Sequence, residues 1–347
     1  MKPEGLAVWK FRDASASMFP TYFPSRRTFL RSIAAAAVSM RVAAESGAAQ
    51  SMHRRLTILD APSNLGLKPP SAGKEPGVKQ MAHVLRAHGI VARLHAEDAG
   101  EITPPKYEEA KDPATKIRNA QAIRNYSAQL AKRIGALLEE RRFPLVLGGD
   151  CSILLGSALA LRKRGRYGLL FIDGHSDLLT PEISQTGGAA GMDLALATGT
   201  GPKLLTEIDG IGPYIQPGDA VVFGYNWPPP DQASPATPKQ PMTAFPLSTV
   251  RKQGVAHSAQ TAVAHLEDVG LGFWIHLDLD VLAPEWMPAV DSPNPGGMIP
   301  EELLTTLKIA VHSKRCIGME VTIYDPTQDP KQQGADLIVK LLAQTFS

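Results

Sequence analysis

From residue 56 onward, the hydrophobic positions follow two spacings in turn, one typical of strands and one typical of helices. Short apolar runs predict strands at residues 56–61, 90–94, 145–147, 168–172, 220–223, 272–277 and 316–321. Longer stretches with apolar residues three and four apart predict helices at residues 78–88, 120–142, 258–269, 301–313 and 332–346. Strands that alternate with helices indicate an α/β fold, with a parallel sheet covered on both faces. Ligands of such sheets bind at the carboxyl ends of the strands.

No internal repeat or domain boundary is visible between residues 49 and 347. A proline-rich stretch at 227–241 could be a linker, but the alternation of strands and helices continues after it. This stretch is therefore interpreted as a loop or lid, and residues 49–347 as a single domain.

Residues 1–48 differ in character from the rest of the chain. Arg26 and Arg27 are followed by Thr-Phe-Leu, by an alanine-rich apolar stretch at 32–38 and then by small residues. This order is typical of a twin-arginine export signal. We expect the twin-arginine export machinery to recognise it, cleavage to remove it, and the mature protein to be periplasmic or otherwise extracytoplasmic, without a membrane anchor. An amphipathic surface helix is the structural alternative.

Charge and cysteine content exclude several classes of protein. The chain has 36 Lys and Arg against 34 Asp and Glu, and its formal net charge of +2 is too small to indicate nucleic-acid binding. Its two cysteines, Cys151 and Cys316, cannot form a disulfide framework. Cys316 precedes Glu320 on one predicted strand, roughly 13 Å from the strand's carboxyl end. We therefore expect Cys316 to lie in the core and to form no disulfide with Cys151.

Three polar motifs each follow a predicted strand. They are Gly-Gly-Asp-Cys-Ser at 148–152, Asp-Gly-His-Ser-Asp at 173–177 and Asp-Leu-Asp at 278–280, and a fourth strand ends near Glu320. Taken singly, each motif would more often be a turn, a cap or a core histidine. Together they gather carboxylates whose mutual repulsion requires protonation or a cation. The acids and the histidine of the second and third motifs are two residues apart, which puts each set on one face of extended backbone, so the combination predicts a metal site.

These motifs resemble those of the ureohydrolase family, which comprises arginases, agmatinases, guanidinobutyrases and formiminoglutamases. Family members carry Gly-Gly-Asp-His-Ser, Asp-Ala-His-x-Asp and a later Asp-x-Asp on a strand, and the loop at 284–297 also looks like theirs. The resemblance covers nearly all of the chain from about residue 56. It implies a three-layer α/β/α sandwich with a mostly parallel sheet.

The resemblance also implies a set of ligands for two divalent ions, usually manganese. These ligands are Cys151, Asp173, His175, Asp177, Asp278 and Asp280. Asp173 and Asp278 would bridge the two ions. The residue at 151 and Asp177 would complete the shell of one ion, while His175 and Asp280 would complete that of the other.

Glu320 matches the family acid that binds the guanidinium group of a small cationic substrate. Glu320 and Asp177 are therefore the residues expected to act in catalysis. By the same resemblance, a hydroxide that bridges the ions would attack the amidino carbon.

Three departures separate the chain from the family pattern. Cys151 replaces a histidine, and its thiolate would favour zinc, nickel, cobalt or iron over manganese; alternatively, Cys151 is an apolar residue beside a single working ion. Ala190 stands where the family often has a histidine that helps proton transfer. Nearby, Asp193 either reaches the cleft or caps a helix. The segment 224–226 lacks an arginine that is common after this strand.

The leading hypothesis is a metal-dependent hydrolase of linear C–N bonds in guanidino or amidino compounds, which uses metal-bound hydroxide. A single ion held by Asp173, His175 and Asp278 would instead suit a deacetylase-like amidohydrolase acting on acylated amines. A non-catalytic relative that binds a small cationic metabolite is the third possibility. The family resemblance also implies a homo-oligomer, either a trimer or a hexamer.

Overall fold

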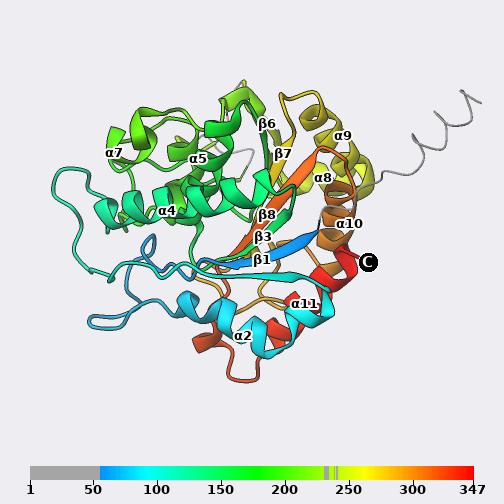
Figure 1. Cartoon of the computed structure of the whole chain (residues 1–347), viewed down its shortest axis with the longest axis horizontal. Coiled ribbons are helices and arrows are strands. Elements are labelled where there is room, and N and C mark those ends of the chain that lie inside the picture. Colours follow the sequence, from blue (N-terminus) through cyan, green and yellow to red (C-terminus); the bar gives the residue numbers. More distant parts are fainter. Residues whose placement is uncertain (1–54, 230–233, 238, 240) are drawn as a thin grey trace, which may run out of the picture. The chain divides into compact units, whose positions relative to one another are not determined.

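Eight parallel strands form one sheet in the computed structural model, within the residues it describes, which are 55–229, 234–237, 239 and 241–347. Their order across the sheet is β2-β1-β3-β8-β7-β4-β5-β6 (Figure 1). The strands are β1 (Leu56–Asp60), β2 (Glu97–Glu101), β3 (Phe143–Leu147), β4 (Gly168–Ile172), β5 (Ala220–Phe223), β6 (Thr243–Phe245), β7 (Phe273–Asp278) and β8 (Cys316–Thr322). The predicted α/β class is confirmed, while the predicted export signal at 1–48 lies outside the described residues.

Helices cover both faces of this sheet (Figure 1). One face carries α4 (Ala120–Glu139), α5 (Leu154–Arg164), α6 (Asp193–Ala197) and α7 (Lys203–Thr206). The other carries α2 (Met81–Ala87), α3 (Ile90–Arg93), α8 (Leu247–Gln253), α9 (Val255–Glu267), α10 (Pro300–Val311) and α11 (Gln333–Thr345). In β3, Val146 packs against the first set of helices, and Leu145 and Leu147 pack against the second. Central strands are therefore buried on both faces, as in other parallel sheets, and the three-layer α/β/α sandwich is confirmed.

The helices differ in how clearly the hydrophobic pattern of the sequence predicts them. Helices α4, α9, α10 and α11 alternate buried and exposed residues at helical spacing, which is the pattern that predicts them. In contrast, every residue of α5 from Leu154 to Leu161 is buried, so this helix has almost no polar face to reveal its period. Among the described residues, none of the helices has the length and apolarity needed to cross a bilayer.

The strand predicted at 90–94 is wrong, because the chain forms the short helix α3 there. Gly89 adopts a left-handed conformation, with φ of 75°, between α2 and α3, and this allows a new helical turn to start at Ile90. The edge strand is instead β2, whose sequence Glu-Asp-Ala-Gly-Glu pairs only with β1. An edge strand that is largely exposed needs no apolar run, so the hydrophobic pattern does not show it.

The four central strands β3, β8, β7 and β4 bring distant parts of the sequence to one edge of the sheet. In register, Val146 of β3 lies beside Glu320 of β8, Glu320 beside His276 of β7, and His276 beside Phe171 of β4. Since β-strand side chains alternate between faces, this row shares the face covered by α4 and α5. Residues two positions further along each strand reach the carboxyl edge on that same face.

Candidate metal centre

Local hydrogen bonds turn the chain sharply where β3 and β7 end. After β3, the side chain of Asp150 accepts a hydrogen bond from the backbone N–H of Ser152 at 2.8 Å, which caps a short turn starting at Cys151. At the end of β7, the side chain of Asp278 accepts one from the N–H of Asp280 at 2.7 Å. An aspartate side chain commonly caps a helical turn in this way. The turns therefore hold Cys151 and Asp280 at the carboxyl edge.

An outer group of Asp173, His175 and Asp280 forms the first cluster of possible metal ligands. One ligand atom from each lies within 4.8 Å of the others. His175 Nδ1 is 3.0 Å from Asp280 Oδ2 and 3.7 Å from Asp173 Oδ1. Asp173 Oδ2 is buried and has no hydrogen-bond partner. Two carboxylates and one imidazole are ligands that suit manganese and similar divalent ions.

The electrostatics of this outer group reflect crowding of negative charge. Burial, together with the nearby Asp280, raises the pKa of Asp173 to about 6. Burial alone would lower the pKa of His175, but Asp280 and Asp173 outweigh it and raise that pKa to about 12. Burial and the charges of Asp280 and Asp173 also hold the pKa of Asp278 well above its usual range. A bound cation would remove this repulsion.

Cys151 lies beside Asp278 but outside the outer group. Its Sγ donates to Asp278 Oδ2 at 2.8 Å and lies 3.0 Å from Thr322 Oγ1. Burial and the adjacent carboxylates raise the pKa of the Cys151 thiol well above its usual range. Cys151 carries a free thiol, so it forms no disulfide with Cys316, which is buried in the core as expected.

Cys151 also belongs to a second, inner cluster, with Asp193 and His276. One ligand atom from each of the three lies within 4.8 Å of the others, and all three residues are buried. His276 Nε2 is 3.6 Å from Asp193 Oδ2. Asp193 is the first residue of α6, and Met192, not Asp193, occupies the cap position. Asp193 Oδ1 nevertheless accepts a hydrogen bond from the N–H of Leu194 in the first turn of α6, while its buried Oδ2 has no hydrogen-bond partner.

Glu320 lies below the edge, on β8, rather than at it. It is fully buried, and its Oε1 is 2.7 Å from His276 Nδ1. Its Oε2 accepts a short hydrogen bond from the hydroxyl of Ser157 on α5. Both carboxylate oxygens are thus engaged by the protein. The structure brings Glu320 to the inner cluster, and not to the cavity described next.

A cavity of about 290 Å³ lies above the outer group. Four of the predicted residues line it: His175, Asp177, Asp278 and Asp280. Other lining residues include Lys68, Ala190, Trp227 and Asp291, and the Trp227 ring centre is 5.9 Å from that of His175. Cys151, Asp173 and Glu320 are not among its described lining residues. The cavity is therefore open to the outer group and closed to the inner one.

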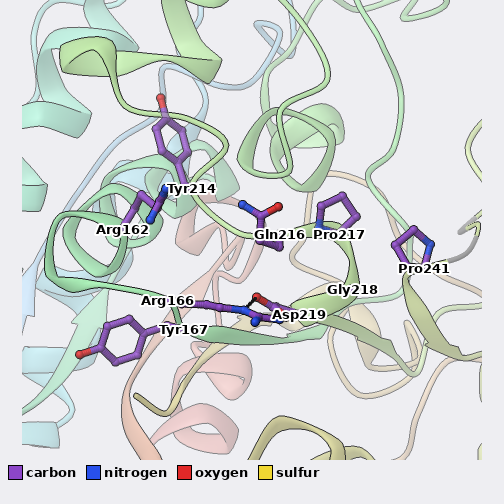
Figure 2. Close-up of a pocket in the computed structure, with 9 residues that line it drawn as sticks. All are labelled: Arg162, Arg166, Tyr167, Tyr214, Gln216, Pro217, Gly218, Asp219 and Pro241. Carbon is purple, nitrogen blue, oxygen red and sulfur yellow. Dashed lines mark hydrogen bonds and ion pairs between the residues drawn. The ribbon is translucent and has the colours of Figure 1, made fainter. Parts of the chain in front are cut away.

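A larger hollow, of about 570 Å³, lies near the starts of β4 and β5, at the other edge of the sheet. Figure 2 shows Arg166 reaching toward Asp219 within it, and two bonds of 2.7 Å join these side chains. None of the predicted site residues lines this hollow. The chemistry expected from the sequence therefore lies at the carboxyl edge, as it does in other open α/β sheets.

The chain is similar to known proteins over most of its length. The family model described as the arginase family matches residues 30–347. This chain belongs to the arginase family. Arginase from Bacillus caldovelox is 28% identical over 295 residues, which are 84% of this chain and 97% of that protein. Arginase from Brevibacillus brevis is 29% identical over 305 residues, which are 85% of this chain and 98% of that protein. The solved structure of the Bacillus caldovelox enzyme superposes with a TM-score of 0.76 at 27% identity, covering 85% of this chain and 98% of the other.

Within this arginase-family fold, the motif pattern alone does not point to His276. The available signal is its position two residues before Asp278 on the same strand, because that spacing puts both side chains on one face. Asp278 and Asp280 are two residues apart, and His276 stands two residues before Asp278, so the same spacing includes His276. Its partner Asp193 carries a weaker signal, since a lone aspartate at the start of a helix is common.

Proposed function

We propose that this arginase-family protein hydrolyses a linear C–N bond of a guanidino or amidino compound in a metal-dependent reaction. Membership in the family supports this general class of chemistry. The observation that carries the proposal is the outer group beneath the cavity, where Asp173, His175 and Asp280 lie within ligand distance of one another. Carboxylate and imidazole ligands at the floor of an accessible cavity are what metal-assisted hydrolysis needs.

The residues present fit a divalent ion at the outer group. The buried Oδ2 of Asp173 has no hydrogen-bond partner, and a cation would supply one. Asp173, His175 and Asp280 would hold this ion, and manganese suits their oxygen and nitrogen atoms. When bound, a divalent ion supplies Lewis-acid polarisation of the scissile group. A second ion in the family position would involve Asp173, Asp177, Asp278 and the thiol of Cys151, and that thiol suits manganese poorly.

The cavity itself favours a small cationic substrate. Asp177 and Asp291 add acidic groups to its lining, and Lys68 is the one basic side chain among its described lining residues apart from His175. Trp227, whose residue surface is 43% exposed, offers an aromatic ring on which a planar guanidinium can stack. These side chains would bind and orient the substrate above the outer group.

A screen for release of urea, formamide and ammonia tests the proposal. The metal-free protein would be loaded in turn with manganese, zinc, cobalt, nickel and iron, and assayed with arginine, agmatine, guanidinobutyrate and formiminoglutamate. We expect turnover with at least one pair of metal and substrate, and loss of that turnover in Asp280→Asn. A folded, metal-loaded protein that binds these compounds but converts none of them would favour the non-catalytic alternative and overturn the proposal.

A second candidate is a single-ion amidohydrolase that acts on acylated amines. It is supported by the outer group, which brings Asp173 and His175 together without Cys151, although its third member is Asp280 and not the Asp278 expected from the sequence. Release of acetate from acetylated polyamines, by a protein that holds one ion per chain and releases no urea, would distinguish it from the first candidate.

We also propose export of this protein through the twin-arginine pathway and assembly into a homo-oligomer. The export proposal is supported by Arg26, Arg27 and the apolar stretch that follows them. The assembly proposal follows only from the family resemblance, and sedimentation of the mature chain would test it.

A further inference from the structure

The inner cluster is enclosed more completely than the outer group. Asp193 and His276 are 0% exposed and Cys151 is 1% exposed. They come from three separate segments: the turn after β3, the start of α6 and the middle of β7. Despite this separation in sequence, one ligand atom from each lies within 4.8 Å of the other two. A thiol, an imidazole and a carboxylate therefore lie close together in the protein interior.

Two atoms of the inner cluster have no hydrogen-bond partner, although they lie within ion-pair distance of each other. Asp193 Oδ2 and His276 Nε2 are both buried and make no hydrogen bond. They are 3.6 Å apart, which is too long for a direct hydrogen bond. Burying an unpaired carboxylate oxygen and ring nitrogen costs free energy, and protein interiors rarely leave such atoms unsatisfied. An ion that binds both atoms would satisfy them.

His276 is also oriented as a metal ligand would be. Its Nδ1 faces Glu320 Oε1 at 2.7 Å, and Glu320 is in turn held by the hydroxyl of Ser157. The imidazole stacks on Phe171, with ring centres 4.7 Å apart and planes 7° from parallel. A carboxylate acceptor keeps the proton on Nδ1 and leaves the lone pair of Nε2 directed at the cluster. Metal-binding histidines almost always have such a partner on the other ring nitrogen.

We propose that Cys151, Asp193 and His276 form an interior metal site for a borderline divalent ion of the zinc, cobalt or iron(II) class. One sulfur, one nitrogen and one oxygen ligand suit such an ion and leave one coordination position open, as in three-ligand zinc sites. Glu320 is then a positioning residue that orients His276. The proposal does not rest on the hydrolase activity, because it concerns ion binding alone.

Two other uses of these side chains fit the structure less well. A Cys151 nucleophile with His276 as its base would need access to substrate, but both residues are buried and neither is among the described residues that line the cavity. In the family arrangement, Cys151 would instead share an ion with Asp173, Asp177 and Asp278. That arrangement leaves Asp193 Oδ2 and His276 Nε2 unsatisfied, so the two arrangements make different predictions for substitutions.

Cobalt binding distinguishes these arrangements. The metal-free full chain would be titrated with Co²⁺, and the thiolate-to-cobalt charge-transfer band in the near ultraviolet would be recorded. We expect this band in the wild type and its loss in Cys151→Ser. His276→Gln and Asp193→Asn should each weaken the binding that produces it by at least about tenfold, and Glu320→Gln by about 10- to 100-fold.

Asp177→Asn is the matched control, because it removes a ligand of the family arrangement alone and should keep the band. Loss of the band in Asp177→Asn with retention in His276→Gln would overturn the proposal. A second measurement uses the wild type and so does not depend on whether the variants fold. X-ray absorption of the zinc-loaded protein should show one sulfur at about 2.3 Å, and a zinc shell without sulfur would also overturn the proposal.

Discussion

Glu320 and His276 face each other in register across β8 and β7, with 2.7 Å between Glu320 Oε1 and His276 Nδ1. This contact occupies the carboxylate that the family resemblance assigns to substrate binding. The hydroxyl of Ser157 takes the other oxygen. A substrate guanidinium could reach Glu320 only by displacing His276 or Ser157 from a fully buried position.

The first prediction separates these two roles of Glu320. Glu320→Gln should lower the affinity for the interior ion by about 10- to 100-fold, because the amide orients the His276 ring less strongly than a carboxylate does. It should leave KM for a cationic substrate nearly unchanged. Cobalt titration and steady-state kinetics would check both values. A large rise in KM with metal affinity intact would restore the role in substrate binding that the resemblance implies.

The second prediction concerns Asp278, which contacts Cys151 and lines the cavity. Because the family resemblance makes Asp278 a bridge between two ions at the carboxyl edge, Asp278→Ala should lose the metal bound there, as measured by elemental analysis, and keep at most the ion of the inner cluster. It should also lose the stabilisation by metal, which is about 2.7 kcal/mol when free metal is at 100 times its Kd and is observed as a rise in Tm. Asp268→Ala, at an exposed position after α9, is the control and should keep the metal. Full metal content in Asp278→Ala would refute the ligand assignment.

The third prediction concerns the tight turn after β3. A Cβ on Gly149 would lie 1.7 Å from the carbonyl oxygen of Ser63, which is backbone and cannot move aside easily. Gly149→Ala should therefore lower the free energy of unfolding by about 3 kcal/mol or more. Gly135→Ala in α4 is the control, since its Cβ meets nothing within 4 Å, and it should raise stability by up to about 1 kcal/mol. Urea denaturation would measure both, and equal stability of the two variants would contradict this account.

The fourth prediction is a pH dependence of stability. His88 lies 2.7 Å from Gln332 Oε1 and 2.8 Å from Asp336 Oδ1, and these hydrogen bonds raise the pKa of His88 above its ordinary 6.5. A raised pKa in the folded state means that the protonated ring contributes stability below pH 6.5, and that this contribution is lost as pH rises through the folded pKa. The drop in Tm on His88→Ala should therefore be larger at about pH 5.5 than at about pH 8.5.

His83 is an exposed histidine in α2, the helix that His88 follows as its C-cap residue, and His83→Ala is the control for this pH series. A difference in Tm between wild type and His88→Ala that is constant across the range would show that the charge of His88 contributes nothing.

The fifth prediction concerns export. Replacement of both Arg26 and Arg27 by lysine should leave the full-length protein in the cytoplasm of cells that have the twin-arginine pathway, because that pathway reads the arginine pair. Fractionation followed by immunoblotting would show the location and the length of the chain. Equal export of the variant and the wild type would refute the twin-arginine assignment.

The outer group and the adjacent Asp278 are predictable from the sequence, because these residues lie at the ends of apolar strands and are spaced two positions apart. Asp173 and Asp278 each stand at the point where a buried strand ends, and the structure brings them to one edge. His276 is not visible in the same way, since a lone histidine within an apolar strand has the pattern of a core residue. Its partner Asp193 comes from a different segment, and only the packing of α6 against the sheet brings the two together.

The helices and strands likewise divide into those that a clear local sequence pattern predicts and those that depend on tertiary packing. Strands β4 and β5 begin and end where the sequence predicts, because each is an uninterrupted apolar run. Helix α5 is missed because buried residues lie on all of its sides, so its sequence shows no helical period. Strand β2 is missed because, at an exposed edge, its polar residues need only backbone pairing with β1.

The position of β8 determines when the sheet can be completed during synthesis. This strand is the last in the sequence, yet it lies between β3 and β7 in the centre of the sheet. Until Cys316–Thr322 has left the ribosome, the strand ends that carry Cys151 and Asp278 have nothing to hold them side by side. The inner cluster can therefore not be completed before β8 is in place, whereas the outer group draws on β4 and β7, which pair directly. A protein released without its final strand and α11 would carry all three ligands of the inner cluster and still lack the strand that holds them together.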